Sequence, residues 1–538
     1  MTPPTDSSRE QQARLFAALR DPACFGADVA QVGALETHIS CVLLTGRFAY
    51  KLKKAVDFGF LDFTTLAARR FYCHEELRLN RRLAPALYLD VVPITGRVDR
   101  PRVGGDGPAI EYAVKMRQFP QEALATRLLS RDEISTSDVD ALAATVARFH
   151  GRVERARPDG EFGAPDGIRR AALDNCDALR NLAGAGAEGE ETEALARWTE
   201  HEAERRRSAF AARLAGGFVR ECHGDLHLGN IARIDDRLTI FDCIEFNPAL
   251  RWIDVMSELA FAVMDLEYRG RTDLARRFLN TYLEITGDYA GLAVLRFYLV
   301  YRALVRAKVA RLRVAQLASP DARQEAIRDS RAHERLASAY AAVARPAIVI
   351  THGFSGSGKT TLSQALVEAL SAVRVRSDVE RKRQAGVEML ARDRRGVEEG
   401  LYGEDATEAT YARLAAVARA IVEGGLVAVV DAAFLKRRQR DLLREVAREL
   451  RIPFVVVDFA AAESVLRARV VERLRLDADA SDADLAVLEH QLRTQEPLAP
   501  DEVSEIVCYD ANAPLERARA PDAWQPVRER IEAALQPV

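Results

Sequence analysis

Long apolar segments are missing from this sequence. No stretch of about 18 apolar residues occurs, and the N-terminal segment MTPPTDSSREQQARLFAAL has no basic region followed by an apolar run. Hydrophobic residues nevertheless make up 48% of the chain and charged residues 29%, a balance typical of globular proteins. We therefore expect a cytoplasmic protein that has no membrane partner.

Cysteine pairs and a strong excess of charge are missing as well. The seven cysteines are scattered without a CxxC pair or metal-like spacing, which indicates isolated thiols in a reducing compartment and no structural zinc. The net charge of −3 disfavours a broad surface for polyanions. A local basic cleft remains compatible with this charge, so nucleic acid stays open as a partner.

Lysine is scarce, because arginine supplies nearly all of the positive charge. A lysine kept where arginine would serve in general suggests a specific role for its compact ammonium group. Three of the lysines lie together in the segment AYKLKK, which ends at Lys54, and another is Lys359 in a glycine-rich segment.

The first three fifths of the chain change from a mixed pattern to a helical one. Before the change, the sequence predicts a helix at about 65–83 and β-like runs at 38–45, 47–54, 88–94 and 109–116. From about 137 to 335 the pattern is mainly helical, apart from a β-rich insert at 218–244. Within the helical part, the small, acidic segment AGAGAEGEETEA at 183–194 predicts a turn between two helices.

The last part of the chain has a regular alternation of strand and helix. A domain boundary is expected near 340–346, where a charged helix ends and Pro346 introduces the apolar run AIVIT. Beyond it, β-like runs are predicted at 347–351, 373–377, 426–431, 453–458 and 504–508. Strands and helices that alternate at this spacing indicate a parallel sheet with helices on both faces.

The segment GFSGSGKTT matches the phosphate-binding pattern GxxxxGK[ST], and it lies between a predicted strand and a predicted helix as that pattern requires. Glycines let the backbone N–H groups converge on phosphate oxygens, and the helix N-terminus adds partial positive charge. We expect Lys359 to reach the β- and γ-phosphates and Thr360 to offer its hydroxyl to Mg²⁺. The expected nucleotide-binding residues are Gly353, Ser355, Gly356, Ser357, Gly358, Lys359, Thr360 and Thr361.

Two carboxylates follow strands of the same predicted sheet, and two arginines follow later. Asp378 is predicted to accept the substrate hydroxyl proton or to position that hydroxyl, and Asp431 to organise Mg²⁺. Helix capping is the alternative for each. Arg469 and Arg473 share a helical face and are predicted to close over the transferring phosphoryl group as part of a lid. A solvated basic face is their alternative.

The segment at about 344–510 resembles small P-loop kinases of the gluconate kinase and zeta-toxin type. GFSGSGKTT, RSDVERKR, DAAF and LRARVVER carry this resemblance. It implies transfer of phosphate to a hydroxyl of a small metabolite, a nucleotide sugar or a polynucleotide end.

A second group of polar residues lies in the β-rich insert. The run HGDLHLGN places Asp225 five residues before Asn230, and Asp242 follows in the β-like run TIFDCIEF. An Asp, Asn and Asp series is what kinase-type phosphoryl transfer requires. Asp225 would take or orient the acceptor hydroxyl proton, while Asn230 and Asp242 would hold Mg²⁺. His223 is expected to brace the loop, and His227 to be structural.

The whole run resembles the aminoglycoside phosphotransferase and choline-kinase-like branch of the protein kinase fold, over about residues 30–335. The resemblance implies a lysine in the first lobe paired with a helical glutamate. We choose Lys53 and Glu76 for this pair, with Lys51 and Glu75 as the competing neighbours.

By position, Met116 to Phe119 fall where the hinge of that family meets the adenine. The sequence departs from protein kinases in one respect, because no GxGxxG lies between the first two strands, where LTGRF has the single Gly46. The cover over the phosphates must therefore differ, and the choice between ATP and GTP stays open.

Together these patterns predict a multidomain protein of α/β and α+β class. We expect a helical extension (1–29), a kinase-like N-lobe (30–118), a mainly helical C-lobe (119–343) and a P-loop NTPase fold with a five-stranded parallel sheet (344–538). The leading hypothesis is a bifunctional, Mg²⁺-dependent phosphotransferase that moves the γ-phosphate of ATP to hydroxyls of small molecules, sugar-like ones among them. The alternatives are a single active P-loop kinase with a regulatory pseudo-kinase domain, and a toxin-type kinase of polynucleotides or cell-wall precursors.

Overall fold

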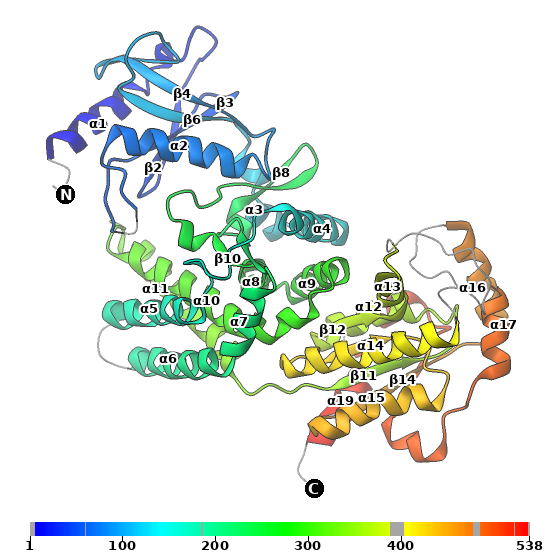
Figure 1. Cartoon of the computed structure of the whole chain (residues 1–538). Helices are drawn as coiled ribbons and strands as arrows, with labels where there is room; N and C mark the ends of the chain where they lie inside the picture. The colour runs from blue at the N-terminus through cyan, green and yellow to red at the C-terminus, as the bar shows by residue number, and fades with distance from the viewer. Residues whose placement is uncertain are drawn as a thin grey trace. The chain divides into compact units, whose positions relative to one another are not determined.

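The computed structural model describes residues 6–59, 61–183, 187–387, 403–476, 485–520 and 522–535. The chain forms two compact units, Met1–Ile168 with Phe210–Asp265, and Arg169–Ala209 with Leu266–Val538 (Figure 1). Within the described residues, no helix has the length and apolar character needed to cross a bilayer.

The first unit contains a six-stranded antiparallel sheet in the order β1-β2-β3-β6-β4-β5. Its strands are β1 (Gly33–Glu36), β2 (Ser40–Leu44), β3 (Phe48–Lys53), β4 (Tyr88–Arg97), β5 (Arg100–Val103) and β6 (Glu111–Arg117). The hairpin predicted around Gly46 is present, because β2 pairs with β3 and Gly46 adopts a φ of 89° at the turn.

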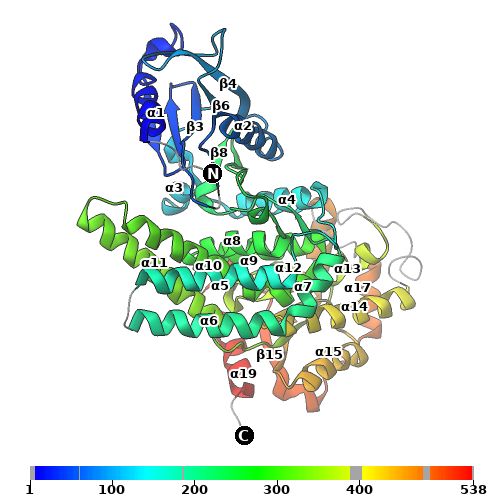
Figure 2. The same cartoon turned by 60° about the vertical axis from the view of Figure 1, so that its left-hand side comes forward.

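Two helices cover opposite faces of this sheet, α1 (Asp6–Ala18) and α2 (Leu66–Asn80) (Figure 2). Side chains alternate between the faces of a strand, so neighbouring residues of β6 enter different cores. Ala113 packs with Leu15 of α1 and with Leu19 just after it, whereas Val114 packs with Cys73 and Leu77 of α2. This alternation fixes which side chains of β3 face α2.

The rest of the first unit is helical, with short antiparallel ribbons that carry the HGDLHLGN run. Its elements are α3 (Ala125–Ser130), α4 (Thr136–Arg152), α7 (Arg207–Ala215), β7 (Val219–Glu221), β8 (Ile231–Ile234), β9 (Arg237–Ile240), β10 (Trp252–Asp254) and α8 (Val255–Tyr268). Helix α7 begins in the second unit, and α8 ends in it. The pairs β7–β10 and β8–β9 hold the loop between them in place.

The second unit begins with long helices. They are α5 (Pro165–Ala183), α6 (Ala187–Arg205), α9 (Thr272–Thr286), α10 (Leu292–Val314) and α11 (Pro320–Ala341). The turn predicted at 183–194 is wrong from residue 187 onward, where α6 begins. Alanine and glutamate favour helix, and the side chain of Thr192 in this stretch is buried, with its hydroxyl 3.1 Å from Glu334.

The predicted five-stranded parallel sheet is confirmed, in the order β12-β13-β11-β14-β15. Its strands are β11 (Ile348–His352), β12 (Val373–Arg376), β13 (Ala428–Asp431), β14 (Phe454–Ala460) and β15 (Ile506–Asp510). Its helices are α12 (Lys359–Leu370), α13 (Ser377–Gln384), α14 (Glu404–Glu423), α15 (Arg437–Leu450), α16 (Glu463–Leu476), α17 (Leu485–Thr494), α18 (Leu515–Ala518) and α19 (Gln525–Leu535). The central strands are buried on both faces, which explains their unbroken apolar runs.

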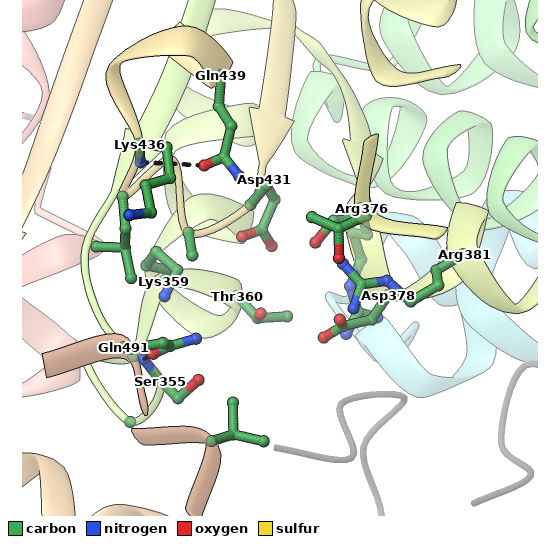
Figure 3. A pocket seen from close by; sticks show the side chains of 18 of the residues that line it. Ser355, Lys359, Thr360, Arg376, Asp378, Arg381, Asp431, Lys436, Gln439 and Gln491 are labelled. Carbon is green, nitrogen blue, oxygen red and sulfur yellow. Dashed lines mark hydrogen bonds between the residues drawn. The ribbon is translucent and has the colours of Figure 1, made fainter. Parts of the chain in front are cut away.

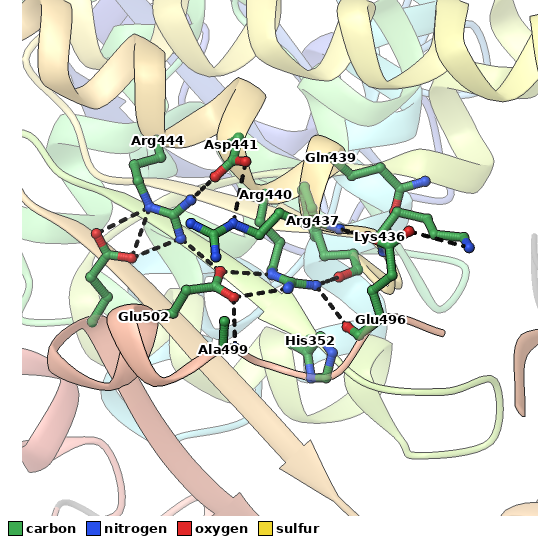
Figure 4. A network of polar contacts seen from close by, with 12 residues as sticks. His352, Lys436, Arg437, Gln439, Arg440, Asp441, Arg444, Glu496, Ala499 and Glu502 are labelled. Carbon is green, nitrogen blue, oxygen red and sulfur yellow. Dashed lines mark hydrogen bonds and ion pairs between the residues drawn. The ribbon is translucent and has the colours of Figure 1, made fainter. Parts of the chain in front are cut away.

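A buried ion pair joins α15 to the short helix η7 (Pro500–Glu505) (Figure 4). Arg440 is fully buried, and its Nε and Nη2 donate to the carboxylate of Glu502 at 2.8 and 2.9 Å. Arg444 adds a further bond to Glu502, and the N–H of Ala499 donates to the same carboxylate. These contacts hold the pKa of Glu502 at about 2, against the effect of burial, which alone would raise it.

We expect Arg440→Ala to lower the free energy of unfolding of the second unit by about 3–5 kcal/mol, because Glu502 would lose its main partner while remaining buried. Urea denaturation of the full chain measures this loss. Arg448→Ala, on an exposed face of the same helix, is the control and should change stability by less than about 0.5 kcal/mol. Equal stability of the two variants would contradict the structural role of the pair.

Candidate functional site

The glycine-rich loop connects β11 to α12 in the middle of the parallel sheet. Gly353, Gly356 and Gly358 all have positive φ, between 84° and 145°. A Cβ on Gly356 would lie 2.6 Å from the carbonyl oxygen of Leu466, so only glycine fits there. The loop borders a pocket of about 1010 Å³ at the carboxyl ends of the strands.

The loop has the features that a polyphosphate requires. Helix α12 begins after Gly358 without a side-chain cap, and a helix N-terminus favours an anion. The hydroxyl of Ser357 is buried and has no hydrogen-bond partner within the described part of the chain. The ammonium of Lys359 donates to the Phe354 carbonyl at 2.8 Å, at the edge of the pocket. The expected loop residues that line the pocket are Ser355, Gly356, Gly358, Lys359, Thr360 and Thr361.

Both predicted carboxylates line the same pocket. Asp431 ends β13, is almost buried, and accepts a hydrogen bond from the hydroxyl of Ser363 at 3.2 Å. Asp378 lies in the first turn of α13, and Figure 3 shows it facing Lys359 and Thr360 across the pocket. The pocket wall adds four residues that the sequence did not single out, Arg376 and Arg381 beside Asp378, and Lys436 and Gln439 on the side of Asp431.

The helical side of the pocket comes from α16 and α17. Arg469 lines the pocket, and its Nη1 would lie 3.6 Å from a Cβ placed on Gly358. The side chain of Arg473 lies outside the described residues. Gln491 of α17 is a contact that the sequence did not reveal, because its side-chain oxygen accepts the N–H of Ser355 at 2.8 Å. No local motif marks this glutamine.

In the first unit, Asp225, Asn230 and His227 form a small hydrogen-bonded group. Asn230 donates to the carboxylate of Asp225 at 2.9 Å and to its carbonyl at 3.0 Å. The Nδ1 of His227 accepts the N–H of Gly229, so its Nε2 carries the proton and lies 3.3 Å from Asp225 Oδ2. His227 therefore orients Asp225, a role that the sequence pattern did not predict.

Asp242 reaches the same sheet that carries the lysines. Its φ is 65°, and its N–H donates to the hydroxyl of Tyr88 at 3.1 Å. The ammonium of Lys51 lies 2.5 Å from Asp242 and 2.9 Å from Glu76. The Lys51 side chain is 12% exposed, and that of Asp242 is 41% exposed, so this end of the cluster opens to solvent.

Lys53 lies deeper in the same cluster. It is 1% exposed and forms ion pairs with Glu76, at 2.7 Å, and with Glu245. Burial alone would lower the pKa of Lys53, but the carboxylates of Glu245 and Glu76 raise it above its ordinary range. Burial would likewise raise the pKa of Glu76, yet Lys51 and Lys53 bring it down to about 2. Glu76 thus serves both lysines, and Glu245 is a partner that the sequence did not predict.

Glu258 of α8 holds the loop that carries Asp225 in place. This buried carboxylate accepts the N–H groups of His223 and Gly224 at 3.1 and 2.7 Å and lies 3.1 Å from His150. The ring of His223 spans the loop, since its Nδ1 accepts the N–H of Asp225 and its Nε2 contacts the carbonyl of Phe241. Burial lowers the pKa of His223, which favours the neutral ring that acceptance at Nδ1 requires.

The two residues chosen for the adenine hinge lie near this group. Met116 and Phe119 are half-buried and pack against one apolar core, and the ring of Phe119 meets that of Phe241 at 5.3 Å. Phe241 directly precedes Asp242. The proposed hinge and the candidate metal ligand are therefore neighbours in space.

Comparison with family models defines the class of protein. A model of the phosphotransferase enzyme family matches residues 68–298, and an AAA domain model matches residues 348–498. The chain is thus an ATP-dependent phosphotransferase with two kinase-type domains.

The family can also be stated. Uncharacterized proteins of Mycobacterium tuberculosis (strain H37Rv) and Mycobacterium bovis are 30% identical to this chain over 456 residues, which is 84% of this chain and 88% of theirs. The chain belongs to the family of these mycobacterial proteins.

Two solved structures are similar to separate parts of the chain. A gluconokinase from Sinorhizobium meliloti 1021 is 24% identical, with a TM-score of 0.26, and covers 35% of this chain and 95% of its own. A choline/ethanolamine kinase family protein from Mesorhizobium loti is 14% identical, with a TM-score of 0.37, and covers 62% of this chain and 99% of its own.

The pKa of Glu258 predicts a pH dependence of stability. Burial would raise this pKa, but the contact with His150 and the hydrogen bonds bring it from 4.5 to about 2. A carboxylate whose pKa is lowered by folding stabilises the fold above its unfolded pKa and loses this effect as the pH falls through its folded pKa. Wild type should therefore exceed Glu258→Gln in stability, by on the order of 3 kcal/mol at neutral pH.

Urea denaturation of both proteins between about pH 7 and about pH 3 tests this. The difference in the free energy of unfolding between wild type and Glu258→Gln should narrow progressively below about pH 4.5, the pKa of this carboxyl in the unfolded chain. A difference that stays constant over this range would contradict the proposed ionisation of Glu258.

Proposed function

We propose that the chain is a bifunctional phosphotransferase, in which each domain transfers the γ-phosphate of ATP to a hydroxyl of a small molecule. The observation that supports this proposal is the presence of two groups of polar side chains, one around Asp225 and one around Lys359. ATP is the proposed donor, with GTP as the alternative, and Mg²⁺ is the proposed metal.

In the first unit, we assign Asp225 to orient the acceptor hydroxyl and to take its proton. Asn230 and Asp242 would hold Mg²⁺, because both offer oxygen ligands and Asp242 lies at the solvent-open end of the lysine cluster. His227 keeps the Asp225 carboxylate in place. A bound nucleotide would supply the phosphoryl group, and Met116 to Phe119 would border its base.

The geometry supports Lys51 as the lysine that reaches the nucleotide phosphates. The sequence favoured Lys53, but that side chain is enclosed between Glu76 and Glu245. Lys51 instead contacts Asp242, the proposed metal ligand, at the exposed end of the cluster. In this proposal Glu76 anchors Lys51, the role that the sequence suggested for Lys53. Lys53 instead compensates the buried carboxylate of Glu245.

In the second unit, the backbone of the loop from Gly353 to Thr361 would hold the phosphates, and Lys359 would neutralise them. Thr360 and Asp431 would hold Mg²⁺ directly or through water. Asp378 faces them across the pocket and would orient the acceptor hydroxyl. Arg469 and Arg473 would supply further positive charge as the phosphoryl group moves.

The acceptors of both sites are proposed to be small molecules. Nucleic acid remains an alternative for the P-loop site, where a polynucleotide would show a steep loss of affinity with salt. A cytoplasmic location is also proposed, supported by seven cysteines that are all unpaired.

Two variants separate the sites. Asp225→Asn and Lys359→Ala should each remove a different set of products, with losses of at least about a hundredfold. Transfer from γ-labelled ATP to a panel of sugars, nucleosides, aminoglycosides and oligonucleotides measures this, with the double variant as the blank. If Lys359→Ala alone abolished all transfer, the first domain would be regulatory and the bifunctional proposal would fail.

A second set of variants tests the choice of lysine. Lys51→Met should lower Asp225-dependent kcat/KM by about a hundredfold, since it removes a phosphate-facing charge. It should cost less stability than the loss of Lys53, because Asp242 is partly exposed and Glu76 keeps Lys53 as a partner. Lys53→Met should instead destabilise the fold by about 3–5 kcal/mol, because two carboxylates lose a buried partner. Lys54→Met, which removes an ion pair to Glu36 on the surface, is the control. The reverse pattern for Lys51 and Lys53 would restore the assignment to Lys53.

A further inference from the structure

Helix α9 lies against α12 and β12 of the P-loop domain, inside the second unit (Figure 1). Asn280 of α9 binds the backbone of β12 on both sides of Val373. Its side-chain oxygen accepts the N–H of Arg374 at 2.6 Å, and its Nδ2 donates to the carbonyl of Ala372 at 3.1 Å. This edge strand of the sheet is therefore paired with a helix side chain along part of its length.

Arg374 connects α9 to the nucleotide-binding loop. Its side chain is 8% exposed, and its Nη2 donates to Glu284 of α9 at 3.1 Å. Its Nη1 donates to the carbonyl of Thr360 at 2.9 Å and to the hydroxyl of Ser363 at 3.1 Å. One guanidinium therefore joins a helix of the phosphotransferase-family match to the first turn of α12.

The connection continues to the second proposed metal ligand. Ser363 accepts from Arg374 and lies 3.2 Å from both Asp431 Oδ2 and the Thr360 carbonyl. Its single hydroxyl proton is shared between these two acceptors. Arg374 thus contacts Thr360, and Ser363 contacts both Thr360 and Asp431, the two residues proposed to hold Mg²⁺. Neither Arg374 nor Ser363 lines the pocket itself.

Glu284 provides the negative charge that this arrangement needs. Its side chain is 13% exposed, and its second carboxylate oxygen lies 3.8 Å from Arg376, which lines the pocket. A buried guanidinium without a carboxylate partner would be costly. Without Glu284, Arg374 would be drawn toward other acceptors, and the carbonyl of Thr360 would lose a fixed donor.

We propose that Glu284 and Arg374 are positioning residues for Mg·ATP at the P-loop, so that helix α9 takes part in holding Thr360 and Asp431. Glu284 lies inside the phosphotransferase-family match and Arg374 inside the AAA domain match, so the P-loop site depends on a residue outside its own domain. This inference rests on the proposed nucleotide site at Lys359.

The test is the affinity of the full chain for ATP with and without Mg²⁺, measured by calorimetry. For Glu284→Gln we expect Mg·ATP to bind about 10-fold to 100-fold more weakly, as is usual when a partner of metal ligands is removed. Binding of ATP in the presence of EDTA should change far less, because the loop and Lys359 remain. A variant that merely loosened the fold would weaken the binding of Mg·ATP and the binding of metal-free ATP equally.

Glu368→Gln is the matched control, since Glu368 pairs with Arg277 across the same α9–α12 contact at 4.0 Å. It should leave both affinities unchanged. Glu284→Gln combined with Ser363→Ala should weaken Mg·ATP by less than the product of the two single effects, because both act on one connected group.

The outcomes are distinct. If Lys359→Ala leaves the affinity of the chain for Mg·ATP at this site unchanged, the proposed P-loop function fails. If Lys359→Ala weakens binding but Glu284→Gln binds Mg·ATP like wild type, or weakens ATP equally with and without Mg²⁺, the positioning role is overturned.

Discussion

Charge that is buried and compensated holds together the lysine cluster of the first unit and a contact between two helices of the second. A charged side chain removed from water is tolerated only when opposite charge and hydrogen bonds replace its hydration. Glu76 meets this condition with two lysines, and Arg440 meets it with Glu502. In each case the pair joins two different elements, so neutralising the charge fixes how those elements pack.

The cluster around Glu76 shows how this constraint assigns roles. Lys51 and Lys53 lie on the same face of β3 because side chains alternate along a strand. Both therefore point toward α2 and Glu76, and local pattern cannot distinguish them. Their difference arises from Asp242 and Glu245, which follow about two hundred residues later in the chain and meet one lysine each. The lysine beside the more exposed carboxylate is the one that a ligand could reach.

Features encoded locally could be predicted from the sequence. The glycine-rich loop, the five parallel strands and the first hairpin each depend on neighbouring residues, and all are present. Residues whose role depends on distant contacts were missed. Gln491, Glu258 and Glu284 have no motif, because each acts through the backbone or the side chain of a segment far away in the sequence. The start of α6 was missed for the related reason that its burial against α11 is not visible in an acidic, alanine-rich segment.

The contact between Glu284 and Arg374 has a thermodynamic consequence in both directions. If α9 helps to fix Thr360, then the free energy that α9 contributes to binding of Mg·ATP must equal the free energy by which Mg·ATP stabilises the position of α9. Helix α9 is part of the phosphotransferase-family match, and it packs on β12 through Asn280 as well. A nucleotide at the P-loop would therefore restrain a helix of the neighbouring domain, with no need for a mobile linker or for direct contact between two substrates. Such coupling gives a physical reason for two kinase-type domains to share one chain.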